Sequence, residues 1–196
     1  MRFGLIAIIF ALAALQPNSN SNVWARETKQ AQQTSEQRAE KLDELFAALK
    51  QARTEQEASV LTPQIWALWN QSGHDDVDLM MRQARQSFSA GQHGAAIARV
   101  DEALRLLPRY SEAWNLRATI LFYMGRDVES VVDIERTLAI EPRHFGALAG
   151  LMMINMRAEN WNGALKALRA GLQVHPFLQE RQLLNRIETL ARGKEL

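Results

Sequence analysis

Residues 111–142 read "SEAWNLRATILFYMGRDVESVVDIERTLAIEP", and this stretch decides the fold. Apolar residues in each half recur at spacings of three and four, which is the period of an amphipathic helix. Gly125 separates the halves, and Pro142 closes the second half because proline cannot continue a helix. The stretch therefore predicts two helices joined by a tight turn.

The same pattern returns with a period of 34 residues. Pro108, Pro142 and Pro176 share this spacing and divide residues 77–178 into the segments 77–110, 111–144 and 145–178. When the segments are aligned, one column is always small, which fits a close contact between helices, and others are always large and apolar. The small column holds Ala96, Ser130 and Ala164, and the large columns include Val100, Ile134 and Leu168 and also Leu104, Leu138 and Leu172. A strict period of this length is typical of stacked repeats.

A 34-residue helix–turn–helix unit with these columns and a terminal proline resembles the tetratricopeptide repeat (TPR) family. The resemblance implies an all-α fold, a right-handed superhelical solenoid of antiparallel helix pairs. The whole chain is similar to short exported bacterial TPR-containing proteins that carry a Trp-rich hairpin before three repeats, and for this group no enzymatic activity is implied. The sequence departs from the family pattern where Glu159-Asn160 replaces the usual turn glycine of the third repeat.

The flanks of the repeats divide into three segments. Residues 26–37 are Gln-rich without a large apolar side chain, which predicts a flexible leader. Residues 38–73 predict a degenerate helical hairpin that caps the N-terminal side of the stack, with Pro63 either kinking its second helix or setting that helix's start after an N-cap at Thr62. Residues 179–196 predict a C-terminal capping helix and tail that cover the last repeat.

Residues 1–25 have the composition of a secretory signal peptide. Arg2 precedes the apolar run 3–15, and the small residues Val23 and Ala25 precede Arg26. The run is shorter than the roughly 20 residues that span a bilayer, although an uncleaved anchor remains the alternative. A lipid-anchored lipoprotein is excluded because the chain has no cysteine.

Composition excludes several classes of function. Without cysteine there are no disulfides, thiolate zinc sites or thiol nucleophiles. The 23 basic and 22 acidic residues are interspersed and form no basic stripe, so we expect no nucleic-acid partner. Removing residues 1–25 takes away one charge and leaves a neutral chain, so membrane contact is expected only if the N-terminal segment stays uncleaved.

No motif predicts catalysis, a cofactor or a metal site. The cluster Glu141, Arg143 and His144 falls in a turn between repeats, where the basic pair would lie near the carbonyl end of the preceding helix. The run "HDDVD" (74–78) is better explained by a helix start with Asp75 or Asp76 as N-cap. HExxH, GxSxG and Gly-rich phosphate loops do not occur. We therefore expect a protein that is not an enzyme and has neither cofactor nor metal.

Arg117 stands at a repeat position that should be buried between helices. An unpaired buried charge would cost several kcal/mol, so we predict that Asp133 or Glu135 neutralises it.

The resemblance also implies where a partner would bind. In TPR proteins the first helices line a concave groove that holds an extended peptide or a partner helix. Some members grip a C-terminal carboxylate with an ordered set of lysine, asparagine and arginine. Here Met81 stands where one lysine would be and Leu116 where an asparagine would be, so we do not expect that ligand. By position, the groove would comprise Met81, Arg85, Phe88, Asn115, Thr119, Phe122, Tyr123, Gly146, Ala149, Gly150, Met153, Met156 and Arg157.

Gly146 and Gly150 lie four residues apart and so share one face of the predicted helix, although each weakens a helix by about 1 kcal/mol relative to alanine. Their low floor would admit either a partner backbone or a neighbouring helix of the same chain. The resulting expectation is an exported, periplasmic, non-catalytic module for protein or peptide partners. The alternative is an accessory subunit of an envelope enzyme or assembly machine, held at the inner membrane by residues 3–15.

Overall fold

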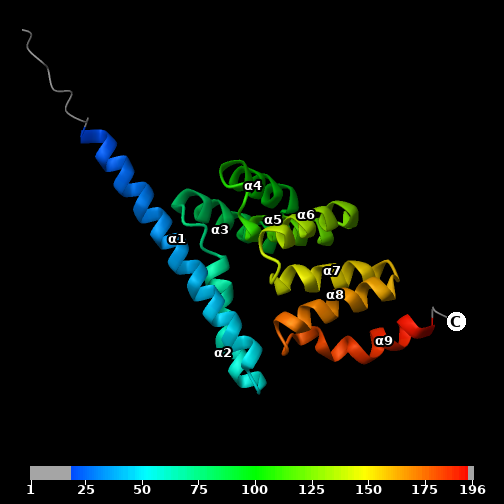
Figure 1. Ribbon diagram of the computed structural model, residues 1–196. Helices are drawn as coiled ribbons and strands as arrows, with labels where there is room; N and C mark the ends of the chain where they lie inside the picture. Colours follow the sequence, from blue (N-terminus) through cyan, green and yellow to red (C-terminus); the bar gives the residue numbers. More distant parts are fainter. Residues whose placement is uncertain (1–18, 194–196) are drawn as a thin grey trace, which may run out of the picture.

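The computed structural model describes the backbone of residues 19–193 and the side chains of residues 33–193, and all regular structure in this part of the chain is helical. The predicted apolar run 3–15 lies outside the described residues. Figure 1 shows the helices as a ladder of antiparallel pairs with a longer pair crossing one side. In chain order they are α1 (Ser19–Gln51), α2 (Glu55–Trp69), α3 (Asp75–Ser89), α4 (His93–Leu106), α5 (Ser111–Tyr123), α6 (Asp127–Ile140), α7 (Phe145–Arg157), α8 (Trp161–Val174), the 3-10 helix η1 (Gln179–Leu183) and α9 (Leu184–Gly193).

The predicted all-α fold of antiparallel helix pairs is confirmed, and the pairs α3/α4, α5/α6 and α7/α8 stack side by side. The small column Ala96, Ser130 and Ala164 is almost completely buried, as a close helix contact requires. Gly91 and Gly125 turn the chain with φ of +73° and +74°, a region that suits glycine. Glu159 takes the same left-handed conformation in the third turn, with φ of +54°, at the position where glycine is missing.

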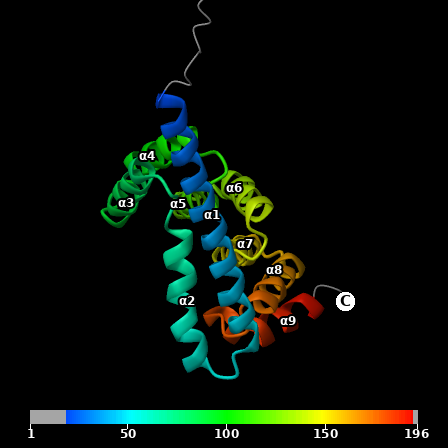
Figure 2. The same ribbon diagram turned by 60° about the vertical axis from the view of Figure 1, so that its left-hand side comes forward.

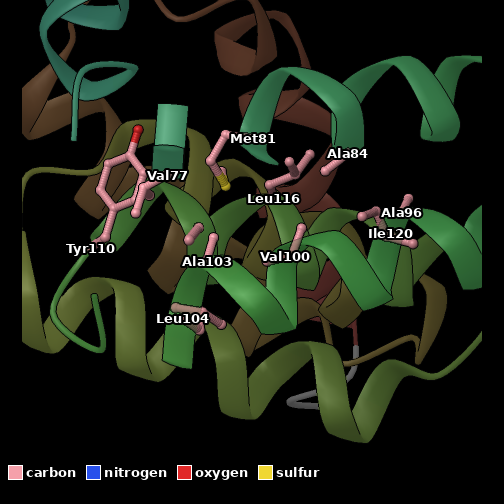
Figure 3. Close-up of a cluster of buried hydrophobic side chains, with 11 residues drawn as sticks. Val77, Met81, Ala84, Ala96, Val100, Ala103, Leu104, Tyr110, Leu116 and Ile120 are labelled. Atoms are coloured by element: carbon pink, nitrogen blue, oxygen red, sulfur yellow. The ribbon is translucent and has the colours of Figure 1, made fainter. Parts of the chain in front are cut away.

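The core runs through the stack because each repeat shares its buried side chains with the next. In the cluster of Figure 3, Val77, Met81 and Ala84 from α3 meet Val100 and Leu104 from α4 and Leu116 and Ile120 from α5. A second cluster joins Ala118 and Ile134 to Ala147 and Ile154 of the third repeat. No repeat has a core of its own, so each depends on its neighbour.

The leader prediction for residues 26–37 differs from the structure, in which they belong to the 33-residue helix α1. The segment contains no glycine or proline and is rich in Gln, Glu, Ala, Lys and Arg, all good helix formers. These residues favour a helix even without large apolar side chains, so α1 extends through this segment.

The hairpin α1/α2 is formed as predicted, but it is not a cap on the first repeat. Its core residues, including Phe46 and Trp69, cluster with Phe145 at the start of α7 and with Leu178 after α8. Both views show the hairpin crossing the repeats along one edge of the stack (Figures 1 and 2). The physical reason is that the tryptophans of α2, Trp66 and Trp69, pack against apolar residues in the turns before and after the third repeat, Phe145 and Leu178.

Helix α2 also begins earlier than Pro63 suggests. Thr54 is the N-cap and accepts a hydrogen bond from the Glu57 backbone N–H at 3.2 Å, and the helix continues through Pro63. The Thr62 hydroxyl instead donates to the Ala58 carbonyl, at 2.8 Å. At the other end of the chain, α9 covers the last repeat by burying Ile187 against Met152 and Leu168.

Candidate functional site

A pocket of about 250 Å³ lies between the first helices of the second and third repeats, α5 and α7. Its floor is low because Ala118, Ala147, Ala149 and the glycines of α7 present little side chain. The predicted groove residues that line it are Asn115, Thr119, Phe122, Tyr123, Gly146, Ala149, Gly150 and Met153. The structure thus brings together eight of the thirteen residues assigned to the groove from the sequence.

The two glycines of the floor have different neighbours. A Cβ atom on Gly146 would lie 2.7 Å from Cη2 of Trp66, so this glycine makes room for the hairpin. A Cβ on Gly150 would lie 3.5 Å from Cδ1 of Ile134, which is an ordinary contact. Packing within the chain therefore explains Gly146, whereas it leaves the pocket at Gly150 open to an added methyl group.

Two further pockets adjoin the first. One of about 340 Å³ is lined by Met152, Met153 and Met156 together with residues of η1. The other, of about 800 Å³, separates α2 from the start of α7 and includes Trp66, Phe145 and Gly146. Shared lining residues join the three into one trough along α7, with mostly apolar walls.

The other predicted groove residues lie at its edges or beneath it. Arg157 stacks on the ring of Phe122 at 3.8 Å and forms an ion pair with Asp127. Phe88 packs against the exposed Tyr123 ring, with centroids 5.4 Å apart.

Met81 corrects the prediction, because it is fully buried in the core and presents nothing to the groove. At its position the first repeat is covered by α5 of the second repeat, as Figure 3 shows with Leu116 beside Met81. Ala149, the equivalent residue of the third repeat, remains partly exposed and lines the groove. The repeat register fixes which way a side chain points but not what lies over it.

No family model matches the chain. A TPR repeat-containing protein of Rhizobium etli is 41% identical over 137 residues, which make up 70% of this chain and 67% of the relative. The chain belongs to the TPR repeat-containing proteins. The TPR2B domain of yeast Sti1, solved as a pHsp70 complex, matches with a TM-score of 0.53 and 14% identity over 63% of this chain and all of that chain, which shows a shared fold.

A buried polar network runs beneath the groove of this TPR protein and links its repeats. Glu112 of α5 accepts from Arg85 at 3.3 Å and from the Asn115 amide at 3.0 Å. His144 at the start of α7 lies 3.3 Å from the same carboxylate. Because both Glu112 and His144 are buried, the network ties α3, α5 and α7 together rather than offering groups to a ligand.

His144 itself corrects the expectation of a cation beside a helix C-terminus. Its Nδ1 accepts a hydrogen bond from the Ala147 backbone N–H at 3.2 Å, so it is the N-cap of α7. An acceptor Nδ1 places the ring proton on Nε2, which donates to Glu112. The ring also stacks on Trp69, with centroids 4.1 Å apart and planes 7° from parallel. The histidine is a structural joint between the hairpin and the third repeat.

The neighbouring Arg143 holds the hairpin from outside. Its guanidinium pairs with Glu141 at 2.9 Å and with Asp43 of α1 at 2.6 Å, and it lies 4.5 Å from the centre of the Phe46 ring. The bond to Glu141, and then the bond to Asp43, raise the pKa of Arg143. The cluster 141–144 is thus a docking point for the hairpin, in agreement with its assignment to an inter-repeat turn.

The predicted partner of Arg117 is confirmed as Asp133. Nε and Nη2 of Arg117 donate to the two carboxylate oxygens of Asp133, both at 2.8 Å, and Nη1 donates to Asp101 at 2.6 Å. The bonds to Asp133 hold the pKa of Arg117 above its usual range although burial lowers it. This bidentate pair joins α5 to α6, and the contact with Asp101 extends it to α4.

The run 74–78 begins a helix, as expected, although His74 rather than an aspartate is the N-cap. Asp78 accepts from the Ser72 backbone N–H at 2.8 Å and so ties the preceding loop to α3. No group of three or more metal-binding side chains occurs within the described part of the TPR protein. In that same part, no helix is both long and apolar enough to cross a membrane.

Two contributors to the trough were not found from the sequence. Trp66 forms one wall from α2, and Glu180 of η1 borders all three pockets. Trp66 precedes the repeats and Glu180 follows them, so the 34-residue period includes neither. Only the crossing of the hairpin and the return of η1 over α7 bring them to the site.

Proposed function

We propose that this TPR protein is an exported, non-catalytic docking module that holds a peptide or a partner helix in the trough along α7. The observation that carries the proposal is the pocket of about 250 Å³ between α5 and α7, whose floor is built of alanine and glycine. A floor without bulky side chains lets a ligand backbone approach closely, and Met153 beside it offers an adaptable apolar contact.

The family supports an interaction role in general, because TPR proteins are usually interaction modules without catalytic activity. The solved neighbour is a domain in complex with pHsp70, which is consistent with a peptide or protein partner. The titratable groups near the groove floor also support a role without catalysis. Glu112 and His144 are buried and contact each other, and Arg85 donates to the same Glu112 carboxylate, so these groups are used within the fold instead of facing a substrate.

Peptide selection tests the groove directly. The full chain would be used to select binders from a phage-displayed library of random peptides, and the selected peptides would be titrated against variants. We expect Met153→Glu and Gly150→Leu to weaken binding by about tenfold or more, equivalent to at least about 1.4 kcal/mol. Val128→Glu is the matched control, because Val128 is 81% exposed on α6.

The melting temperature of each variant separates a lost site from a lost fold. Weakened binding at an unchanged melting temperature supports the groove. A large drop for Gly150→Leu would show that this glycine serves internal packing, and Met153, which is 46% exposed, then carries the test. Equal binding by Met153→Glu and wild type would contradict the proposal.

Export is proposed from the signal-like residues 1–25, with the periplasm as destination. N-terminal sequencing of the protein recovered from the cell envelope tests it. A chain that starts at Arg26 supports cleavage, whereas an intact N-terminus favours the alternative of an accessory subunit anchored at the inner membrane by residues 3–15.

A further inference from the structure

Glu180 lines all three pockets of the trough. It lies in η1, the short helix that follows the third repeat, and it borders the pocket at α5 and α7, the methionine pocket and the pocket beside α2. Its side chain is partly buried. A ligand lying along α7 would therefore pass over this carboxylate whichever pocket it entered first.

The charge along the trough is acidic. Glu55 and Glu180 are the only charged residues that line the three pockets within the described part of the chain. Glu55 is paired with Arg181 at 3.0 Å. Glu180 makes no ion pair or side-chain hydrogen bond with the other described residues. By contrast, ten arginine or lysine side chains in that part of the chain pair with other carboxylates.

An unpaired carboxylate determines which ligands the trough accepts. A ligand that covers the apolar walls also removes water from Glu180, and burying a charge without a partner is strongly unfavourable. A lysine or arginine on the ligand removes this penalty by forming a charge-assisted hydrogen bond. A ligand with an acidic group at that point would add repulsion.

The pockets that Glu180 borders have mostly apolar walls. Met153 and Met156 line the methionine pocket, and methionine adapts to differently shaped apolar side chains. Phe122 and Gly150 line the pocket between α5 and α7. The flanking positions of a ligand would therefore carry apolar side chains, with the basic residue between them.

We propose that the trough recognises a peptide segment in which a lysine or arginine is flanked by apolar residues, with Glu180 as the anion that pairs with the basic side chain. This inference rests on the proposed groove function and gives its ligand a chemistry. This specificity is for a ligand of positive charge, whereas TPR proteins that bind a C-terminal carboxylate select a negative one. The buried Met81 and Leu116 offer neither the lysine nor the asparagine of that carboxylate-binding set.

A charge swap tests the proposal. The random peptide library would be selected in parallel on the full-length wild type and on Glu180→Lys, and the enriched peptides resynthesised with the basic residue replaced by norleucine. We expect wild type to enrich a lysine or arginine between apolar residues, and Glu180→Lys to enrich aspartate or glutamate at that position. For a wild-type peptide, Glu180→Gln should weaken binding by about tenfold and abolish the difference between lysine and norleucine.

Glu135→Gln is the matched control, because Glu135 is exposed on α6 and the variant has the same change in charge. The proposal is overturned if Glu180→Gln binds lysine peptides as well as wild type does, or if the swap leaves the enriched charge unchanged. Peptides that still depend on Met153 in that case would leave the groove function standing. Peptides that bind equally to Met153→Glu would overturn both proposals.

Discussion

The repeats and the hairpin are both antiparallel helix pairs, yet they are held by different kinds of contact. The repeats stack through columns of small residues that recur every 34 positions, such as Ala96, Ser130 and Ala164. The hairpin docks through aromatic rings that occur once, with Trp69 stacked on His144 and Trp66 against Phe145. The comparison teaches that a periodic sequence specifies how one repeat packs on the next. The hairpin, which crosses the repeats, needs a separate set of contacts that the period does not encode.

The largest expected effect is the release of the hairpin. Trp69→Ala removes a side chain that is 5% exposed and contacts Phe46, Phe145 and His144, so the free energy of unfolding should fall by about 3–5 kcal/mol. Urea unfolding followed by circular dichroism measures the loss. Hydrogen exchange should show faster exchange in α2 while α5 and α6 remain protected. Equal loss of protection in all helices would mean that hairpin and repeats form one unit.

Two variants control this experiment. Trp69→Phe keeps a ring in place and removes an indole N–H that is buried without a hydrogen-bond partner in the described part of the chain, so most of the stability should return. Tyr123→Ala removes an aromatic side chain that is 66% exposed, and its effect should stay below about 1 kcal/mol.

The next largest expected effect concerns an ion pair within the repeats and not the hairpin. Arg117→Met leaves Asp133, 3% exposed, without its bidentate partner. Because Arg117 itself is 25% exposed and partly screened, we expect a loss of about 2 kcal/mol, measured by urea unfolding. The double variant Arg117→Met/Asp133→Leu removes the stranded charge and should recover part of the loss. An unchanged or raised melting temperature for the single variant would exclude a required ion pair.

A smaller effect on stability is expected when each of the two glycines of α7 is replaced by alanine. Gly146→Ala places a methyl group against Trp66, which is held by Trp69 and Phe145, so strain should exceed the gain in helix propensity and lower stability by about 1 kcal/mol. Gly150→Ala meets no obstacle and should raise stability by up to about 1 kcal/mol. Thermal melts of the two variants give the signs. Destabilisation by both would mean that the floor at Gly150 is also required for packing.

The smallest expected effect is a decrease in folding stability at acidic pH, caused by a histidine that contacts the hairpin. His175 accepts from the Phe177 backbone N–H through Nδ1, and its Nε2 lies 2.9 Å from the Thr62 hydroxyl of α2. Burial lowers the pKa of His175 from its ordinary value of 6.5, so the folded state prefers the neutral ring. Its contribution is therefore complete above pH 6.5 and declines as the pH falls below that value. Urea midpoints from pH 8 to pH 5 would show it, and His175→Gln should have a flatter profile.

The stack was predictable because its rules are local and repeated. The turn glycines, the small column and the closing prolines each recur at a fixed spacing, so errors in one repeat are corrected by the others. The groove was predictable in part, since eight of its residues meet in one pocket. The prediction for Met81 was wrong because the same repeat position is buried under α5 in the first repeat and partly exposed in the third.

The position of the hairpin could not be deduced, for a physical reason. Its contacts pair Trp66 and Trp69 with residues more than 70 positions later, such as Phe145, and they occur once in the chain. The same is true of Glu180, which reaches the groove only because η1 turns back over α7. Aromatic residues in α2 predict that the hairpin packs, but not against which repeat.

The central claim is that ligands bind in the trough along α7, beside the hairpin, and not on the outer face of the stack. Hydrogen exchange of the full chain, with and without a peptide selected from the random library, tests it most directly. The account predicts slower exchange in α5, α7 and η1 when the peptide is bound, with α4, which lines none of the three pockets, unchanged. Protection confined to α4, with α7 unaffected, would contradict it.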